Sequence, residues 1–199
     1  MSKAIQNLVL FKLGWVACIL AAAALLPEFA VLAVAIVVLI HLARAPVPAK
    51  EAFFLFCAAL LGLAWESVVL LTGLVEYPGL GAGSLLAPSW IVAMWVLFAT
   101  TINYGFKWLK RHWAIASFFG LVGGPMAFFA GSAAGAAEFS NPVAALAVIG
   151  VGWAILLPLL TLVADTIIDS TLLEPGPRRP RAGSVPALVP LMGRTARNA

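Results

Sequence analysis

Six long apolar runs, each bounded by charged residues, proline or glycine, limit what this chain can fold into. They cover residues 7–26, 29–45, 52–75, 89–106, 113–137 and 143–168. A helix that rises 1.5 Å per residue needs roughly 20 apolar residues to cross the hydrocarbon core of a bilayer. The sequence therefore predicts an all-α, polytopic membrane protein built as a bundle of six transmembrane helices.

The composition supports a membrane environment. Of the 199 residues, 63% are hydrophobic and only 10% are charged, and the mean hydropathy is +1.07. A water-soluble core of this size cannot hide so much apolar surface. The net charge of +4 does not indicate a nucleic-acid partner, because the basic residues lie between the apolar runs and form no basic patch.

The basic residues also predict an orientation, since positively charged loops stay in the cytoplasm. Three of the five connections carry no Lys or Arg and contain the acids Glu28, Glu76 and Glu138. The basic residues fall near the start of the chain, in the other two connections and after the last run: Lys3, Lys12, Arg44, Lys50, Lys107, Lys110, Arg111, Arg178, Arg179, Arg181, Arg194 and Arg197. Six crossings with both termini in the cytoplasm place all of them on one side of a bacterial inner membrane.

The chain divides into a transmembrane domain, residues 1–173, and a basic tail, residues 174–199. The tail is rich in Pro, Gly and Arg, so we expect it to be disordered and to act as an orientation signal and a solubilising tail. The alternative is that its cluster of Arg178, Arg179 and Arg181 rests on anionic lipid headgroups. Membrane lipids are the expected partners. Small residues of the first helix, such as Ala17 and Ala21, offer a face on which a partner membrane protein can dock.

Glu66 is the first candidate for a functional residue, because an ionisable group deep in a transmembrane helix is costly and often functional. It shares a helix face with Gly62, Val69 and Gly73, so we expect it to point into the bundle, toward a closely packed neighbour. Such a carboxyl group can donate a proton, bond to a polar headgroup or bind a cation. A purely structural hydrogen bond is the alternative.

The fourth run ends in polar residues. Thr100, Thr101 and Asn103 lie near the expected cytoplasmic end, and Thr100 is expected at nearly the depth of Glu66. A threonine in a transmembrane helix can satisfy its hydroxyl on its own backbone. Asn103 does this less readily, so interhelical bonding or ligand contact is expected there.

The fifth run contains Gly123, Gly124 and Pro125. Proline removes one helical hydrogen bond and frees the carbonyl of Leu121, which predicts a kink near the middle of the membrane. Such helices line binding sites in transporters, but they also occur as simple kinks with close glycine packing. We therefore take Glu66, Thr100, Asn103, Gly124 and Pro125 as candidate substrate-binding residues.

Other sites are not indicated. His41 and His112 lack neighbouring thiols or carboxylates in a metal-binding pattern, so no metal is expected. The sequence contains no phosphate-binding loop and no nucleophile motif of a serine hydrolase, and no cofactor is expected.

The chain resembles a bacterial membrane-protein family catalogued as domain of unknown function 2878. The resemblance covers most of residues 8–168, and the run from Ala99 to Asn103 is its most specific part. The matching residues are Glu66, Ser67, Gly73, Pro78, Pro88, Trp90, Trp95, Phe98, Ala99, Thr100, Thr101, Asn103, Gly123, Gly124 and Pro125. The chain departs from the family pattern at Glu66, where Asp is more usual, and at Tyr104, where His or another polar residue is common. The resemblance implies no activity, and it suggests a companion of lipid-modifying enzymes.

Three functions remain open. The first is binding or handling of a lipid or other hydrophobic molecule, as an accessory to a lipid-modifying enzyme. The second is transport of a small solute, either directly or as the substrate-binding subunit of an importer of the energy-coupling-factor type. The third is an intramembrane enzyme with Glu66 as acid or base, for which the sequence offers few second catalytic groups. Residues 77–88 are expected to cover any cavity beside the third helix.

Overall fold

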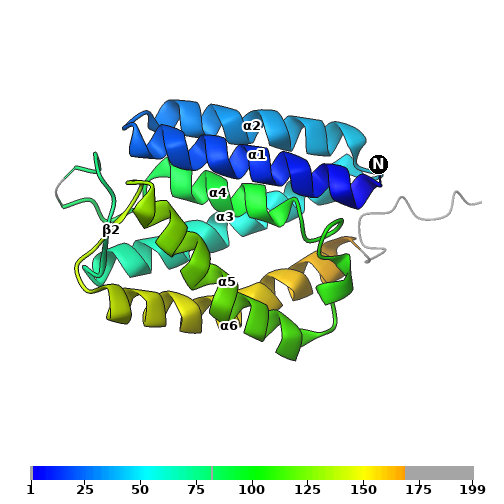
Figure 1. Ribbon diagram of the computed structural model, residues 1–199. Helices are drawn as coiled ribbons and strands as arrows, with labels where there is room; N and C mark the ends of the chain where they lie inside the picture. The colour runs from blue at the N-terminus through cyan, green and yellow to red at the C-terminus, as the bar shows by residue number, and fades with distance from the viewer. Residues whose placement is uncertain (1, 82, 169–199) are drawn as a thin grey trace, which may run out of the picture.

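The computed structural model describes residues 2–81 and 83–168, and Figure 1 shows its helices as an elongated bundle. The described chain contains a short 3₁₀ helix, η1 (Lys107–Leu109), and two short strands, β1 (Val75–Glu76) and β2 (Glu138–Phe139). Its α-helices are α1 (Lys3–Ala23), α2 (Pro27–Arg44), α3 (Pro48–Leu71), α4 (Ser89–Ala99), α5 (Trp113–Ala133) and α6 (Pro142–Ile168). The expected all-α fold is confirmed. The boundary expected after residue 173 and the basic tail lie outside the described residues.

Five of these helices are long and apolar enough to cross a membrane, namely α1, α2, α3, α5 and α6. The remaining helix, α4, has only 11 residues, so the expectation of a helix over residues 89–106 is wrong beyond Ala99. The hydroxyls of Thr100 and Thr101 donate to the carbonyls of Leu97 and Phe98, at 2.7 and 2.6 Å. Backbone bonds also shift here to a spacing of three residues, and the chain continues as turns.

Proline and polar caps fix the helix starts. The sequence predicted starts at residues 29 and 52 for the second and third helices, whereas α2 and α3 begin at Pro27 and Pro48. Proline fits this position because the first turn leaves its backbone N–H groups unpaired. Ser2 caps α1 through Ile5 N, and Asn141 caps α6 through Ala144 N.

The two ends of the bundle differ in character. The N-terminus, the α2–α3 and α4–α5 connections and the last turn of α6 lie at one end (Figure 1), which we call the basic end because it carries Lys3, Arg44, Lys50, Lys107, Lys110 and Arg111. Lys12 is the exception. The sequence placed it at the start of the first helix, but it lies nine positions after Lys3, about 13 Å along α1.

A two-stranded ladder closes the opposite end. β1 pairs antiparallel with β2, with Val75 opposite Phe139 and Glu76 opposite Glu138. The Ser140 hydroxyl adds a 2.7 Å bond to the carbonyl of Gly73. The ladder therefore fastens the α3–α4 connection to the α5–α6 connection.

Glycine allows two close helix contacts. On α5, a Cβ at Gly124 would lie 2.6 Å from Trp153 Cγ of α6, and Gly120 sits against the Trp153 carbonyl. On α3, Gly62 lies against Trp95 of α4. Helices that meet through glycine approach more closely than larger side chains permit. The small-residue stripe expected on α3 ends at Val69, because Gly73 lies beyond the helix in a turn with φ of +68°.

Candidate functional site

A cavity of about 460 Å³ lies among α1, α3, α4, α5 and α6. Its wall is mainly apolar and rich in aromatic rings, with Phe11 and Trp15 from α1, Trp90 and Trp95 from α4, Phe119 from α5 and Trp153 from α6. The volume falls within the range of roughly 300–1,000 Å³ that is typical of small-molecule sites. We call this space the aromatic cavity.

The aromatic cavity reaches the outer surface of the bundle between α1 and α5. Two of its lining side chains on α5 are largely exposed there, Phe119 at 44% and Met126 at 66%. Lys12 of α1 also lines the cavity, and it is exposed with its ammonium 4.9 Å from the Trp15 ring. The opening therefore combines apolar side chains with one cation.

Glu66 provides a carboxyl group in the otherwise apolar wall. It lies in α3, it is completely buried, and it lines the cavity. Trp95 Nε1 donates to its Oε1 at 2.8 Å, and the Tyr77 hydroxyl donates to its Oε2 at 3.0 Å. The expectation that Glu66 points into the bundle is confirmed.

Tyr77 reaches this site from the connection that follows β1. Its ring meets Trp90 edge to face at a centroid distance of 5.6 Å. Burial first, and then the electrostatic interaction and hydrogen bond with Glu66, raise the pKa of the Tyr77 hydroxyl well above its ordinary value of 10. The hydroxyl therefore keeps its proton and acts as a donor.

Residues 77–88 are anchored to α3 at both ends. Tyr77 bonds to Glu66, and at the other end the backbone N–H of Ala87 donates to the Ser67 hydroxyl at 3.0 Å. The segment that was expected to cover a cavity thus contacts the third helix at these two points, and Tyr77 is its residue in the lining of the aromatic cavity.

Trp95 joins Glu66 to the opposite wall of the cavity. Its ring stacks on Trp153 of α6, with centroids 4.5 Å apart and planes 24° from parallel. Trp153 Nε1 is buried and has no hydrogen-bond partner among the described residues. A buried donor without a partner carries a desolvation cost, so the wall contains one polar group with unused bonding capacity.

The structure divides the five predicted site residues among three places. Glu66 and Gly124 line the aromatic cavity. Pro125 packs toward α6, where a Cβ on Gly150 would lie 3.2 Å from its ring, and the Leu121 carbonyl faces the same glycine. Thr100 and Asn103 do not line this cavity.

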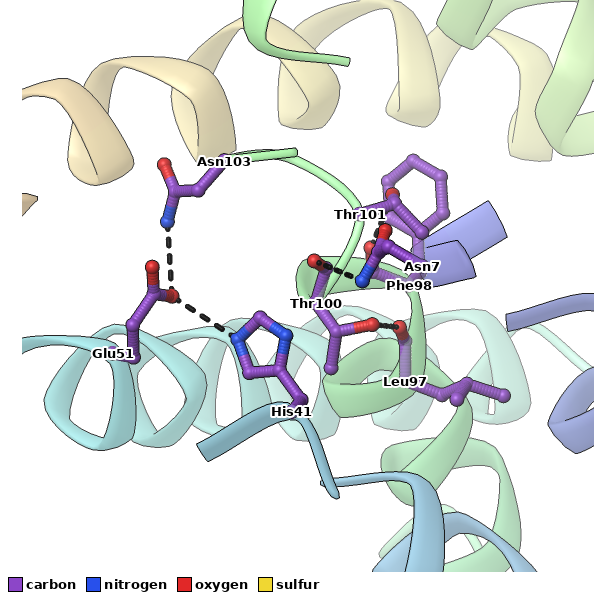
Figure 2. A network of polar contacts seen from close by, with 8 residues as sticks. All are labelled: Asn7, His41, Glu51, Leu97, Phe98, Thr100, Thr101 and Asn103. Carbon is purple, nitrogen blue, oxygen red and sulfur yellow. Dashed lines mark hydrogen bonds and ion pairs between the residues drawn. The ribbon is translucent and has the colours of Figure 1, made fainter. Parts of the chain in front are cut away.

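Thr100 and Asn103 belong to a polar cluster at the basic end, shown in Figure 2. Glu51 Oε2 accepts a 3.0 Å bond from Asn103 Nδ2 and lies 3.3 Å from His41 Nε2. Asn7 Nδ2 donates to the Thr100 carbonyl at 3.1 Å. Asn103 thus bonds to α3, as expected, but from the turn that follows α4 and not from a helix, and the Thr100 hydroxyl is satisfied by the backbone of its own segment.

Several site residues were not found from the sequence. Tyr77 and Trp95, the two partners of Glu66, lie 11 and 29 residues away from it, and no local periodicity connects them. Glu51, His41 and Asn7 lie near the ends of apolar runs, where polar residues are ordinary. The signal that the sequence offered was the amide of Asn7, which falls within the first helix, α1.

The geometry around Glu66 suits binding. Each carboxyl oxygen accepts one bond from the protein and keeps a second acceptor lone pair, so a hydroxyl, amide or ammonium group of a ligand that reaches Glu66 can donate to it. The remainder of the wall offers apolar contact and ring faces. An amphiphilic molecule with a small polar group matches this wall.

Comparison with known proteins identifies the family but no function. No curated protein and no solved structure matches the chain. One family model, described as Protein of unknown function (DUF2878), matches residues 4–159. Since this match covers most of the sequence, including all five predicted site residues, the chain belongs to that family.

Proposed function

We propose that this protein binds a lipid or another hydrophobic small molecule in the aromatic cavity, with Glu66 as the acceptor for the polar group of the ligand. The observation that supports this most is a completely buried carboxyl group in the wall of a 460 Å³ cavity that is otherwise mainly apolar. Ligand sites usually combine an apolar wall with a few polar groups in this way.

The side opening suits a ligand that arrives from the bilayer. Phe119 and Met126 line the cavity and are also exposed on the outer surface of α5, so a hydrophobic molecule can pass between α1 and α5 without crossing water. Such a route favours a lipid-soluble ligand over the polar solutes that importers carry.

We propose a membrane arrangement to accompany this function. The five long helices each cross the membrane, and α4 together with residues 100–111 completes a sixth crossing. The basic end faces the cytoplasm of a bacterial inner membrane, as the positive-inside rule favours.

Binding is favoured over catalysis by the surroundings of Glu66. Its two polar partners are an indole N–H, which only donates, and a tyrosine hydroxyl that keeps its proton. The indole is neither an acid nor a base here, and the raised pKa makes the tyrosine hydroxyl a poor proton donor, so no effective second acid or base stands beside Glu66 among the described residues. A role in handling the ligand beside a lipid-modifying enzyme fits such a binder.

Native mass spectrometry of the full-length protein extracted in mild detergent tests the proposal. The wild type should retain a hydrophobic molecule that Glu66→Gln loses, because the amide cannot provide two acceptor oxygens. Glu66→Asp should retain part of it. Glu76→Gln, which changes an exposed carboxyl group on β1, is the matched control.

The proposal fails if Glu66→Gln and the wild type carry the same molecule at the same occupancy. Elution volume and thermal unfolding of each variant verify that a loss of ligand does not reflect misfolding.

A further inference from the structure

A second, smaller pocket lies at the basic end, between α1, α2 and the turn that follows α4. It encloses about 30 Å³, and its polar lining consists of Lys3, Asn7, His41, Arg44 and Tyr104. None of the residues that line it also lines the aromatic cavity. We call it the basic-end pocket.

Two buried polar atoms on this pocket have no hydrogen-bond partner among the described residues. They are Asn7 Oδ1 and the Tyr104 hydroxyl oxygen. Asn7 is only 9% exposed, and its amide nitrogen already donates to the Thr100 carbonyl. If the Asn7 amide were rotated by 180°, its Oδ1 would face the Thr100 carbonyl oxygen, and two acceptors cannot bond to each other. The orientation is therefore fixed, and Oδ1 is the atom without a partner among the described residues. Buried polar groups in proteins nearly always have a partner, which points to a bound group.

The charge around the pocket is positive. Lys3 and Arg44 line it and are exposed at the surface. Arg44 Nη2 also donates to Gln6 Oε1, but a guanidinium carries five N–H donors, so the others can face a ligand. Arginine and lysine together are well suited to an anion with several oxygens.

The acidic residue nearest the pocket is Glu51 of α3. Glu51 does not line it, and its Oε2 is occupied by His41 Nε2 and Asn103 Nδ2. The side chain of Glu51 is almost completely buried. Its charge opposes an anion in the pocket, but its Oε2 is already in contact with His41 and Asn103.

Tyr104 supplies a hydrogen-bond donor to the basic-end pocket. Its ring meets His41 edge to face at a centroid distance of 5.3 Å. A phenolic hydroxyl carries its proton at neutral pH, so the Tyr104 hydroxyl can donate to an oxygen in the pocket.

We propose that the basic-end pocket binds a phosphate group. One phosphate oxygen enters and accepts from the Tyr104 hydroxyl, because about 30 Å³ is the space of one water-sized group. The other oxygens stay at the opening, against Lys3 and Arg44. Asn7 Oδ1 accepts from a hydroxyl or ammonium group beside the phosphate, or from a protonated phosphate oxygen. The phosphate belongs either to a phospholipid headgroup at the membrane surface or to a free phosphate compound.

Thermal unfolding of the delipidated full-length protein in detergent tests this assignment. Three ligands are titrated: a short-chain phosphatidylglycerol, the diacylglycerol with the same chains, and inorganic phosphate. Arg44→Gln and Tyr104→Phe should each weaken phosphatidylglycerol binding about tenfold, since each removes hydrogen bonds to a charged group. Lys3→Gln changes an exposed side chain, so it tests the site without disturbing the core.

Lys107→Gln is the matched control, because Lys107 is exposed at the same end and does not line the pocket. Stabilisation by phosphatidylglycerol alone assigns a lipid headgroup, and stabilisation by inorganic phosphate with the same variant pattern assigns a free phosphate. An equal response to diacylglycerol, or an equal loss in Lys107→Gln, overturns the proposal. So does unchanged phosphatidylglycerol binding in Arg44→Gln, Tyr104→Phe and Lys3→Gln.

Discussion

Gly62 of α3 lies directly against the side chain of Trp95 of α4, so that a Cβ at position 62 would be 2.7 Å from the Cβ of Trp95. The same indole donates to Glu66, one helical turn further along α3, and stacks on Trp153. The absence of a side chain at position 62 therefore determines where the Trp95 ring lies and, through it, the shape of the aromatic cavity.

Replacing Gly62 with alanine should displace Trp95, weaken its bond to Glu66 and destabilise the protein by about 1–3 kcal/mol, the usual cost of overpacking. Thermal unfolding and near-UV circular dichroism report both effects. Gly123→Ala is the control, because a Cβ there meets nothing within 4 Å, and alanine should stabilise the helix slightly. Equal stability of Gly62→Ala and the wild type would contradict the expected displacement.

Replacing Tyr77 with phenylalanine should leave Glu66 Oε2 without its 3.0 Å donor and cost about 1–3 kcal/mol. The loss should be smaller in a Glu66→Gln background, since the two residues share one bond. A double-mutant cycle based on chemical or thermal unfolding measures this coupling. Strictly additive effects would show that the bond contributes nothing to stability.

Replacing Asn103 with alanine should remove its bond to Glu51 and destabilise the basic end by about 1–3 kcal/mol. Because Asn103 does not line the aromatic cavity, the molecule that copurifies with the wild type should remain bound at the same occupancy. Native mass spectrometry checks this. A clear loss of that molecule would instead place Asn103 at the ligand, as the sequence first suggested.

Replacing Glu138 with lysine should stabilise the strand ladder. Glu138 lies opposite Glu76, and like charges in direct cross-strand positions are unfavourable, whereas opposite charges gain about 0.2–1 kcal/mol. The gain should shrink as salt screens the pair. Thermal unfolding at low and high ionic strength measures it, and a variant that is less stable at low salt would contradict the prediction.

The fold was largely predictable because a helix that crosses a membrane needs a long apolar run, which is visible in the sequence. Sequence reasoning found all the long helices and the burial of Glu66. It extended the fourth helix to residue 106, because hydropathy does not register that the hydroxyls of Thr100 and Thr101 bond three residues back and favour turns.

The candidate site was less predictable because its contacts join distant parts of the chain. Counting about 1.5 Å of rise per residue predicted that Thr100 lies at nearly the depth of Glu66 in the membrane. That estimate assumed that the fourth helix continues to residue 106. The partners of Glu66 come instead from a loop and from the middle of α4. No sequence spacing encodes these contacts, since they depend on how the helices pack.

The strand ladder also connects two parts of the wall of the aromatic cavity. α5 is held tightly to α6 through Gly120 and Gly124, and the ladder joins the α5–α6 connection to the connection that carries Tyr77. The helix pair that lines one side of the cavity is therefore tied to the segment that supplies a hydrogen-bond donor to Glu66, and this tie lies at the end of the bundle opposite the basic-end pocket.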